Sequence, residues 1–198
     1  MTTFNELLDL VYELTNRPDL SGITTSAIRA ATLKAHQTDF YSKDIYETGV
    51  EFDTLDYRQS LDYYNLISNF RALSYIKRVE SVTDDVGKFM EIITPAEVLD
   101  SYGYNRSDIA YVAGRVLEIR SSVTFQYTLM GAYVFPIVTA DTAFSSWIAE
   151  LYPFAIVYEA ARVVFKAIGY DEQSAQMNSL VAEQYALLKA SALTDVGY

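Results

Sequence analysis

The chain has 198 residues, of which 51% are hydrophobic and 21% are charged, and it contains no cysteine. A chain of this length and composition can bury a substantial core, so disordered, collagen-like and disulfide-rich proteins are excluded, as are thiol chemistry and thiolate metal sites. The formal net charge of −11 argues against a surface that neutralises the phosphates of a nucleic acid.

The first 40 residues predict two helices joined by a short loop. A Thr-x-x-Glu capping box is followed by apolar residues at helical spacing, which indicates a helix from about Thr3 to Thr15. Either Thr24 or Thr25 can cap a second helix that extends toward Phe40. The first ten residues lack the basic start and the apolar run of a secretion signal, so we expect no export.

The region that follows predicts less regular structure. From Asp39 to Asp62 the chain carries seven acidic residues against Lys43 and Arg58, and we interpret this segment as extended and exposed. The stretch 61–80 fits neither the period of a strand nor that of a helix. Beyond a turn at Asp84 and Asp85, we expect a strand over 88–93, a short helix that begins at Pro95, and a loop over 102–108.

The strongest β pattern lies between Leu117 and Leu129, where odd positions are apolar and even positions are polar. We predict a hairpin with strands of about 111–120 and 123–135 and a bend at Ser121 and Ser122. Gly114 is interpreted as a bulge or a close approach, and Pro136 ends the second strand.

The last third predicts three helices. A short helix over 145–151 carries Trp147, and Pro153 begins the next helix, which extends to Ile168 and is buried on nearly all sides. Glu159, Arg162 and Lys166 interrupt its apolar residues, so it is too polar to span a membrane and we expect no membrane segment.

Gly169 ends this helix, and Asp171 caps a final helix that continues to about Ala192. We interpret residues 193–198 as a tail.

Few residues suggest catalysis. His36 is the only histidine, so a Ser-His-Asp arrangement would have to use it, but its spacing from Leu33 and Phe40 favours a half-buried position that serves packing or is solvated. Nucleophile-elbow, phosphate-loop, dinucleotide and calcium motifs are missing from the sequence. We expect no catalytic residue, no metal and no cofactor. A pair of acids between Asp39 and Asp62 leaves open a glycosidase-like alternative.

Tyrosine is abundant, with 17 residues, and tyrosine is prominent in protein interfaces because its ring buries apolar area while its hydroxyl tolerates water. We expect Tyr127 and Tyr158 in the core. Eight others lie in segments that we predict to be exposed, which favours a protein that works by contacting other proteins: Tyr41, Tyr46, Tyr57, Tyr63, Tyr64, Tyr102, Tyr104 and Tyr198.

The order of several segments resembles the head-to-tail adaptor proteins of tailed phages, especially short-tailed ones. These segments are Ala113-Gly114-Arg115-Val116-Leu117-Glu118-Ile119, then Phe125–Pro136, Trp147-Ile148-Ala149-Glu150-Leu151-Tyr152-Pro153, Tyr158–Ile168 and Gly169-Tyr170-Asp171-Glu172. The resemblance is best over 111–188 and looser over the first two helices.

The resemblance implies a structural virion protein of the phage neck that is made in the bacterial host cytoplasm. It implies a homo-oligomeric ring, commonly a dodecamer, that docks on the portal protein, holds a downstream tail or nozzle protein, and acts in genome packaging and ejection. Double-stranded DNA would pass through the ring without specific binding, and an acidic lumen would suit this because it repels phosphates.

We therefore expect one α+β domain in which a helical bundle core, 1–42 and 143–192, carries a β-rich insertion, 43–142. The expected portal-docking residues are Leu193, Val196, Gly197 and Tyr198. The expected contacts to neighbouring subunits or the channel are Asp39, Tyr41, Asp44, Tyr46, Glu47, Glu51, Asp53 and Asp56. The alternatives are a carboxylate-dependent hydrolase that acts on a cell-wall glycan and a non-viral protein-interaction module.

Overall fold

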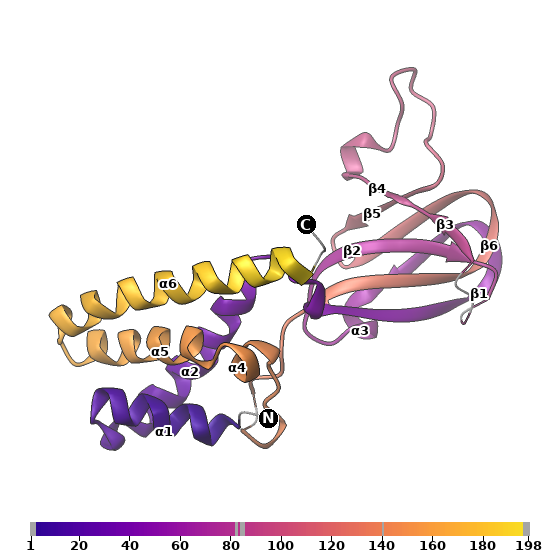
Figure 1. Ribbon diagram of the computed structural model, residues 1–198. Helices are drawn as coiled ribbons and strands as arrows, with labels where there is room; N and C mark the ends of the chain where they lie inside the picture. The colour runs from indigo at the N-terminus through magenta and orange to yellow at the C-terminus, as the bar shows by residue number, and fades with distance from the viewer. Residues whose placement is uncertain (1–2, 82, 84–85, 140, 196–198) are drawn as a thin grey trace. The chain divides into compact units, whose positions relative to one another are not determined.

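The structure is a computed structural model that describes residues 3–81, 83, 86–139 and 141–195. The fold contains both helices and strands, as expected for an α+β protein, and Figure 1 shows them in separate groups. The chain divides into two compact units. We call Met1–Asp44 with Phe135–Tyr198 the helical unit and Ile45–Val134 the sheet unit. Each unit has its own cluster of buried apolar residues, and the sheet unit ends at Val134, short of the expected boundary at 142.

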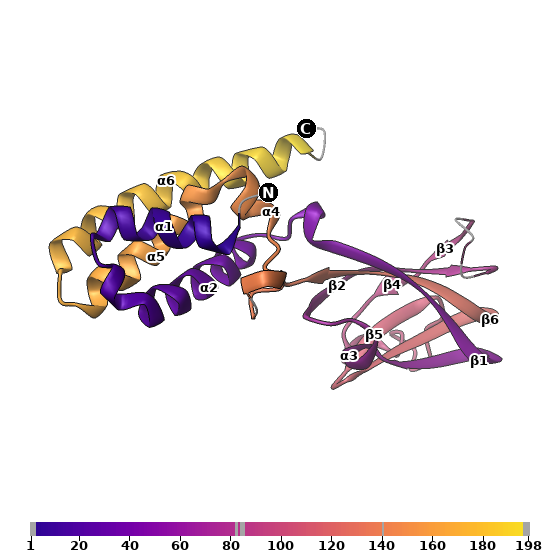
Figure 2. The same ribbon diagram turned by 90° about the horizontal axis from the view of Figure 1, so that it is seen from below.

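The helical unit is built around α5, which packs against α1, α2 and α6 (Figures 1 and 2). Fully buried side chains from four helices meet there, among them Leu7, Ile28, Ile156 and Leu188. Among the described helices, none has both the length and the hydropathy that a membrane span requires. The helices are α1 (Phe4–Thr15), α2 (Ser21–Gln37), α4 (Trp147–Leu151), α5 (Pro153–Ala167) and α6 (Asp171–Asp195).

The predicted ends of the first two helices are confirmed for α1 and wrong for α2. The predicted capping box of α1 is confirmed, because Thr3 Oγ1 accepts the Glu6 N–H at 3.2 Å and Glu6 Oε2 accepts the Thr3 N–H at 2.8 Å. The predicted cap at Thr24 or Thr25 is wrong, because α2 begins at Ser21 and ends at Gln37, short of Phe40. Thr24 is buried inside the helix, where its hydroxyl donates to the Leu20 carbonyl instead.

The predicted boundaries of the later helices hold more closely. Ser146 caps α4, Pro153 begins α5, and Gly169 follows α5 with a φ of +78°. The final helix departs from prediction at both ends: Asp171 is its first residue and not its cap, and α6 continues through Asp195, so the segment 193–195 is helix and not tail.

Glu159 of α5 faces α2, whereas Lys166 of the same helix is exposed. The Glu159 side chain is 4% exposed, and its Oε1 accepts from Lys34 Nζ and from Arg162 Nη2, each at 2.7 Å. Burial raises the pKa of Glu159, but the hydrogen bonds from Arg162 and Lys34 outweigh burial and lower it. Glu159 therefore interrupts the apolar surface of α5 because it forms an ion pair with Lys34 of α2.

The sheet unit is a six-stranded sheet with β6 at its centre. β6 pairs with β1 along one edge and with β2 and β5 along the other, always antiparallel, while β3 pairs with β2, and β4 pairs with β5 in parallel. The elements are β1 (Ile45–Asp62), α3 (Tyr63–Leu66), β2 (Phe70–Val79), β3 (Gly87–Phe89), β4 (Glu91–Ile92), β5 (Ile109–Ala113) and β6 (Val116–Val134), with a 3-10 turn over Pro95–Glu97.

The predicted hairpin is wrong at its bend. Ser121 and Ser122 lie inside β6, and the chain turns instead at Gly114, whose φ of +66° suits glycine. Asp108 accounts for the difference, because its Oδ1 accepts the Ser122 N–H and hydroxyl, each at 3.0 Å, and so accommodates these residues within a strand. The expected end of the strand before Pro136 is confirmed.

The other regions of the sheet unit follow the sequence in part. The segment 39–62, predicted to be extended and exposed, contains the long strand β1, and this prediction is confirmed for most residues of the strand. β1 nevertheless buries Val50 and Phe52 against the sheet core. The unassigned stretch 61–80 contains α3 and β2. The expected strand over 88–93 is confirmed in outline as β3 and β4, and the expected turn at Asp84 and Asp85 lies outside the described residues.

Asp108 is expected to make the stability of the sheet unit depend on acid pH. Burial raises the pKa of Asp108, but hydrogen bonds from Lys88 and Ser122 outweigh burial and lower it to about 2. A lowered pKa stabilises the fold above about pH 4, the range of an unfolded aspartate, and this contribution is lost as pH falls toward 2. Asp108→Asn should therefore cost about 2 kcal/mol at pH 7, since one pKa unit corresponds to about 1.4 kcal/mol, and much less below pH 3.

Hydrogen exchange of the β5 and β6 amides measures this local free energy. Asp53→Asn, on the exposed part of β1, is the matched control and should change the free energy by less than about 0.5 kcal/mol. A cost for Asp108→Asn that stays constant from pH 7 to pH 3 would contradict the assignment.

Candidate functional site

The only histidine of the chain lies in a Ser-His-Asp arrangement. His36 Nδ1 is 2.8 Å from Asp44 Oδ1, and His36 Nε2 is 2.9 Å from Ser146 Oγ. The Trp147 indole N–H donates to the same Asp44 oxygen at 2.7 Å. These distances are those of a catalytic triad, in which aspartate orients the imidazole and the imidazole accepts the serine proton.

Three separate elements bring the network together. His36 lies in the last turn of α2, Asp44 in the 3-10 turn Ser42–Asp44, and Ser146 at the cap of α4. Aromatic packing encloses the network, because Trp147 meets His36 and Tyr41 edge to face at centroid distances of 5.8 and 5.2 Å. Asp44 was expected at the surface and Tyr41 as an exposed contact, and both expectations are wrong for this reason.

The network is buried in the helical unit. His36 is 1% exposed and Ser146 is 5% exposed, so a substrate has no approach to the serine hydroxyl. The Ser146 oxygen also accepts the Ala149 N–H at 3.2 Å, which fixes it as a helix cap. A nucleophile needs an accessible oxygen and free donors for the developing negative charge. The expected half-buried position of His36 is wrong, because its side chain is fully buried.

We expect Ser146 to be inert toward a fluorophosphonate reagent. The reagent must reach Oγ, and at the observed burial the labelled fraction should stay at the background of a Ser146→Ala variant, measured by intact-protein mass spectrometry. Ser60, an exposed serine of the sheet unit, is the control for non-specific labelling. Stoichiometric labelling of Ser146 that requires His36 would instead identify a hydrolase.

Six residues of the expected acidic contact set are exposed: Asp39, Tyr46, Glu47, Glu51, Asp53 and Asp56. Asp39 belongs to the helical unit, and the other five lie on β1 in the sheet unit. Two of the acids bond to tyrosines across the sheet, Glu47 to Tyr75 and Glu51 to Tyr127. Burial and the bond to Glu47 raise the pKa of Tyr75 to about 12. Acids and tyrosines thus share one face of the sheet.

Gly131 makes room for one of these tyrosines. It lies opposite Glu47 in the β1–β6 ladder and opposite Tyr75 in the β2–β6 ladder. A Cβ atom at this position would lie 2.3 Å from Cε1 of Tyr75, so the ring covers the glycine. The position of Tyr75 beside Glu47 therefore depends on a residue without a side chain.

The tyrosine predictions are confirmed in part. Five of the tyrosines predicted to be exposed are exposed: Tyr46, Tyr57, Tyr64, Tyr102 and Tyr104. Tyr63 is buried, because it packs on Phe70 with ring centroids 4.3 Å apart and donates to the Gly114 carbonyl. Tyr127 and Tyr158, expected in the core, are half-buried.

The most exposed tyrosines lie on an ordered loop, residues 98–106, which we call the tyrosine loop. Tyr102 is 85% exposed and Tyr104 is 72% exposed. Asp100 Oδ1 accepts the backbone N–H groups of both tyrosines, at 2.9 and 2.8 Å, and the Asp100 N–H donates to the Tyr104 carbonyl at 2.8 Å. Gly103 completes the turn with a φ of +83°. The sequence Asp-x-Tyr-Gly-Tyr carried this turn signal, because aspartate often bonds the backbone two residues on.

A pocket of about 390 Å³ lies elsewhere on the sheet unit, and we call it the sheet pocket. Leu55 of β1 and Val86 before β3 are 63% and 71% exposed and contribute apolar surface to it. Arg78 and Glu80 supply its charges. A second, shallow hollow on the helical unit is lined by Leu10 and Pro153 with three acids of α1. Neither hollow includes the His36 network. Sequence reasoning missed Leu55 and Val86, because a single exposed apolar residue has no sequence signal.

Of the four expected portal-docking residues, one lies within the described part of the chain. Leu193 lies in the last turn of α6, and Val196, Gly197 and Tyr198 lie outside the described residues. Within the described part of the chain, no group of three or more His, Cys, Asp or Glu side chains could hold a metal ion. Comparison of the sequence with protein-family models and with curated proteins found no match.

Proposed function

We propose that this chain is a head-to-tail adaptor of a tailed phage, a structural virion protein that forms a ring on the portal and joins head to tail. The observation that carries the proposal is the order of elements over 111–188, which resembles that family: two paired strands, the short Trp147 helix, Pro153, a buried helix and a final helix. In this proposal the helical unit is a bundle core, and the sheet unit is a projection inserted into it.

The surface of the described residues supports a protein that contacts other proteins. Large apolar or aromatic side chains are exposed on both units, for example Phe40 at 55% and Phe89 at 62%. Isolated exposed apolar residues are common, but tyrosines held on an ordered loop are typical of interfaces. The buried Ser-His-Asp network also supports a structural role, since its serine is enclosed.

The acidic charge supports a channel that DNA passes through without binding. A net charge of −11 disfavours phosphate contacts, and the acids of β1 are exposed. In this proposal these acids contact neighbouring subunits or line the channel, and the assembled protein is part of the neck at the portal vertex.

Incubation with portal rings expressed from the same phage genome tests the proposal. We expect native mass spectrometry and electron microscopy to show a ring of this chain, of twelve copies in the family's usual form, seated on the portal. A chain that stays monomeric at every concentration, with and without portals, would overturn the proposal and favour a non-viral interaction module.

The proposed portal contact is the C-terminal segment 193–198. Replacing these six residues with a Gly/Ser segment of equal length should abolish portal binding and leave the helical fold intact, because α6 is already anchored by Leu188, which is fully buried. Tyr64→Ser combined with Leu66→Glu, on exposed residues of α3, is the control for a general loss of binding. Portal binding that survives the C-terminal replacement would exclude this docking site.

The alternative function is a carboxylate-dependent hydrolase. Such an enzyme needs two acids that converge in a cleft. Among the described residues that line the sheet pocket, Glu80 is the only acid, whereas the hollow on the helical unit is lined by three acids of α1, Glu6, Asp9 and Glu13.

A further inference from the structure

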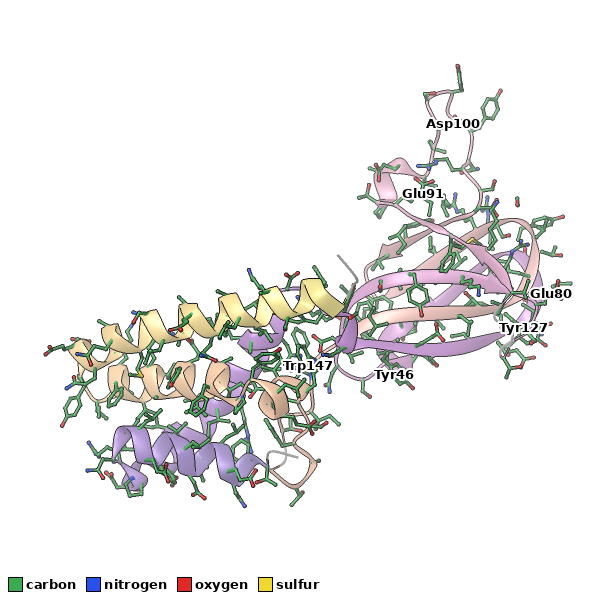
Figure 3. All side chains as sticks on the ribbon, viewed as in Figure 1. Tyr46, Glu80, Glu91, Asp100, Tyr127 and Trp147 are labelled. Atoms are coloured by element: carbon green, nitrogen blue, oxygen red, sulfur yellow. The ribbon has the colours of Figure 1, made fainter. Side chains whose placement is uncertain are left out.

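We propose that the tyrosine loop of one copy of this chain binds in the sheet pocket of the neighbouring copy. This inference rests on the proposed ring, and it names the surfaces that hold two ring subunits together. Figure 3 shows Asp100 of the loop well apart from Glu80 and Tyr127 of the pocket, so the two surfaces of one copy do not meet. A contact between two different surfaces is head to tail, and repeated head-to-tail contacts build a ring when the rotation closes.

The tyrosine loop is organised before any partner binds. The Arg106 N–H donates to the Val98 carbonyl at 2.9 Å at the base of the loop, and the Arg106 guanidinium bonds to Glu91. Arg120 of β6 donates to the Asn105 side chain at 3.0 Å and ties this base to the sheet. Because these bonds already order the loop, its backbone loses little conformational entropy on binding. The rings of Tyr102 and Tyr104 are available to bury apolar area.

The sheet pocket is also formed in the single copy. β1 bulges between Glu51 and Asp56, and the buried side chain of Gln59 holds the bulge by donating to the carbonyls of Thr54 at 2.6 Å and Phe125 at 3.1 Å. This bulge presents Leu55 at the rim of the pocket. A binding partner therefore finds the β1 side of the pocket already shaped.

The chemistry of the pocket fits a tyrosine loop with acidic residues. Leu55 and Val86 offer apolar contact to a ring, Arg78 can stack on its face, and Glu80 can accept its hydroxyl. Arg78 forms no ion pair with a described side chain, and the loop carries the Asp100 carboxylate near its tyrosines, with Glu97 directly before the loop. The charges are complementary, and a pocket of about 390 Å³ is within the size range of sites that hold side chains or small ligands.

A mixing experiment with two variants tests this contact. The loop variant is Tyr102→Ser with Tyr104→Ser, and the pocket variant is Leu55→Glu; these three side chains are more than half exposed, so the fold should be retained, and circular dichroism checks it. Under conditions where the unmodified chain forms rings, each variant alone should associate at least tenfold more weakly. Mixed at equal amounts, the variants should form dimers but not rings, because the intact loop of one still fits the intact pocket of the other.

Matched controls on α3 are Tyr64→Ser and Leu66→Glu, which change exposed residues outside both surfaces and should leave the rings intact. A second measurement uses the lack of native cysteine: Tyr102→Cys combined with Leu55→Cys should give a ladder of disulfide-linked copies, and Tyr64→Cys combined with Leu55→Cys should not. Rings formed equally by either variant, or a mixture without dimers, would overturn the contact while leaving the proposed function standing. Failure of the unmodified chain to associate at all would overturn both.

Discussion

Replacing His36 with alanine is expected to lower the free energy of unfolding of the helical unit by about 3 kcal/mol or more. The substitution leaves the Asp44 carboxylate and the Ser146 hydroxyl buried without their shared partner. Each unsatisfied buried group costs about 1–3 kcal/mol, and the ring contact with Trp147 is also lost. A loss of this size is a large fraction of the stability of a typical domain.

The fluorescence of Trp147 during urea unfolding measures this change, because Trp147 is the only tryptophan and lies in the network itself. His36→Asn is the matched control: its amide can donate to Asp44 from the position of Nδ1 but cannot reach Ser146, so it should restore part of the stability. A loss below about 1 kcal/mol for His36→Ala would show that the network contributes little to folding.

The sheet unit, residues 45–134, is expected to fold when it is produced alone. It has its own buried cluster, which includes Ile76, Ile119 and Met130. Its two ends are neighbours, since Ile45 pairs with Tyr133 in the β1–β6 ladder, so excision breaks the chain at adjacent points. By the same geometry, a short Gly/Ser linker between Asp44 and Phe135 should leave a helical unit that folds without the sheet unit.

The two fragments of the sheet unit should differ sharply in whether they fold. Dispersed amide resonances and a cooperative urea transition are expected for 45–134, whereas a shorter fragment, 45–113, should be unfolded because it lacks the central strand β6. An unfolded 45–134 fragment would show that the two units depend on each other for stability. If it folds, the loop and pocket contact can be measured in the sheet unit alone, since both surfaces lie within it.

Features that depend on a few neighbouring residues were readable from the sequence. The capping box at Thr3, the break at Pro153 and the stop at Gly169 are local rules of backbone geometry and hydrogen bonding, and all three hold in the structure. The turn at Asp100 belongs to the same class, since its bonds span only four residues, although the predicted loop over 102–108 did not include Asp100.

Features that depend on distant partners were decided by the tertiary structure. Ser121 and Ser122 predict a bend from sequence alone, but in the structure Asp108 accepts their hydrogen bonds and both residues lie within a strand. Tyr41 and Asp44 belong to an acidic, polar segment, yet contacts with Trp147, more than 100 positions away in the chain, bury them. Local patterns report the preferences of the backbone, whereas burial depends on which distant side chains satisfy a polar group, and that information is not contained in any short segment.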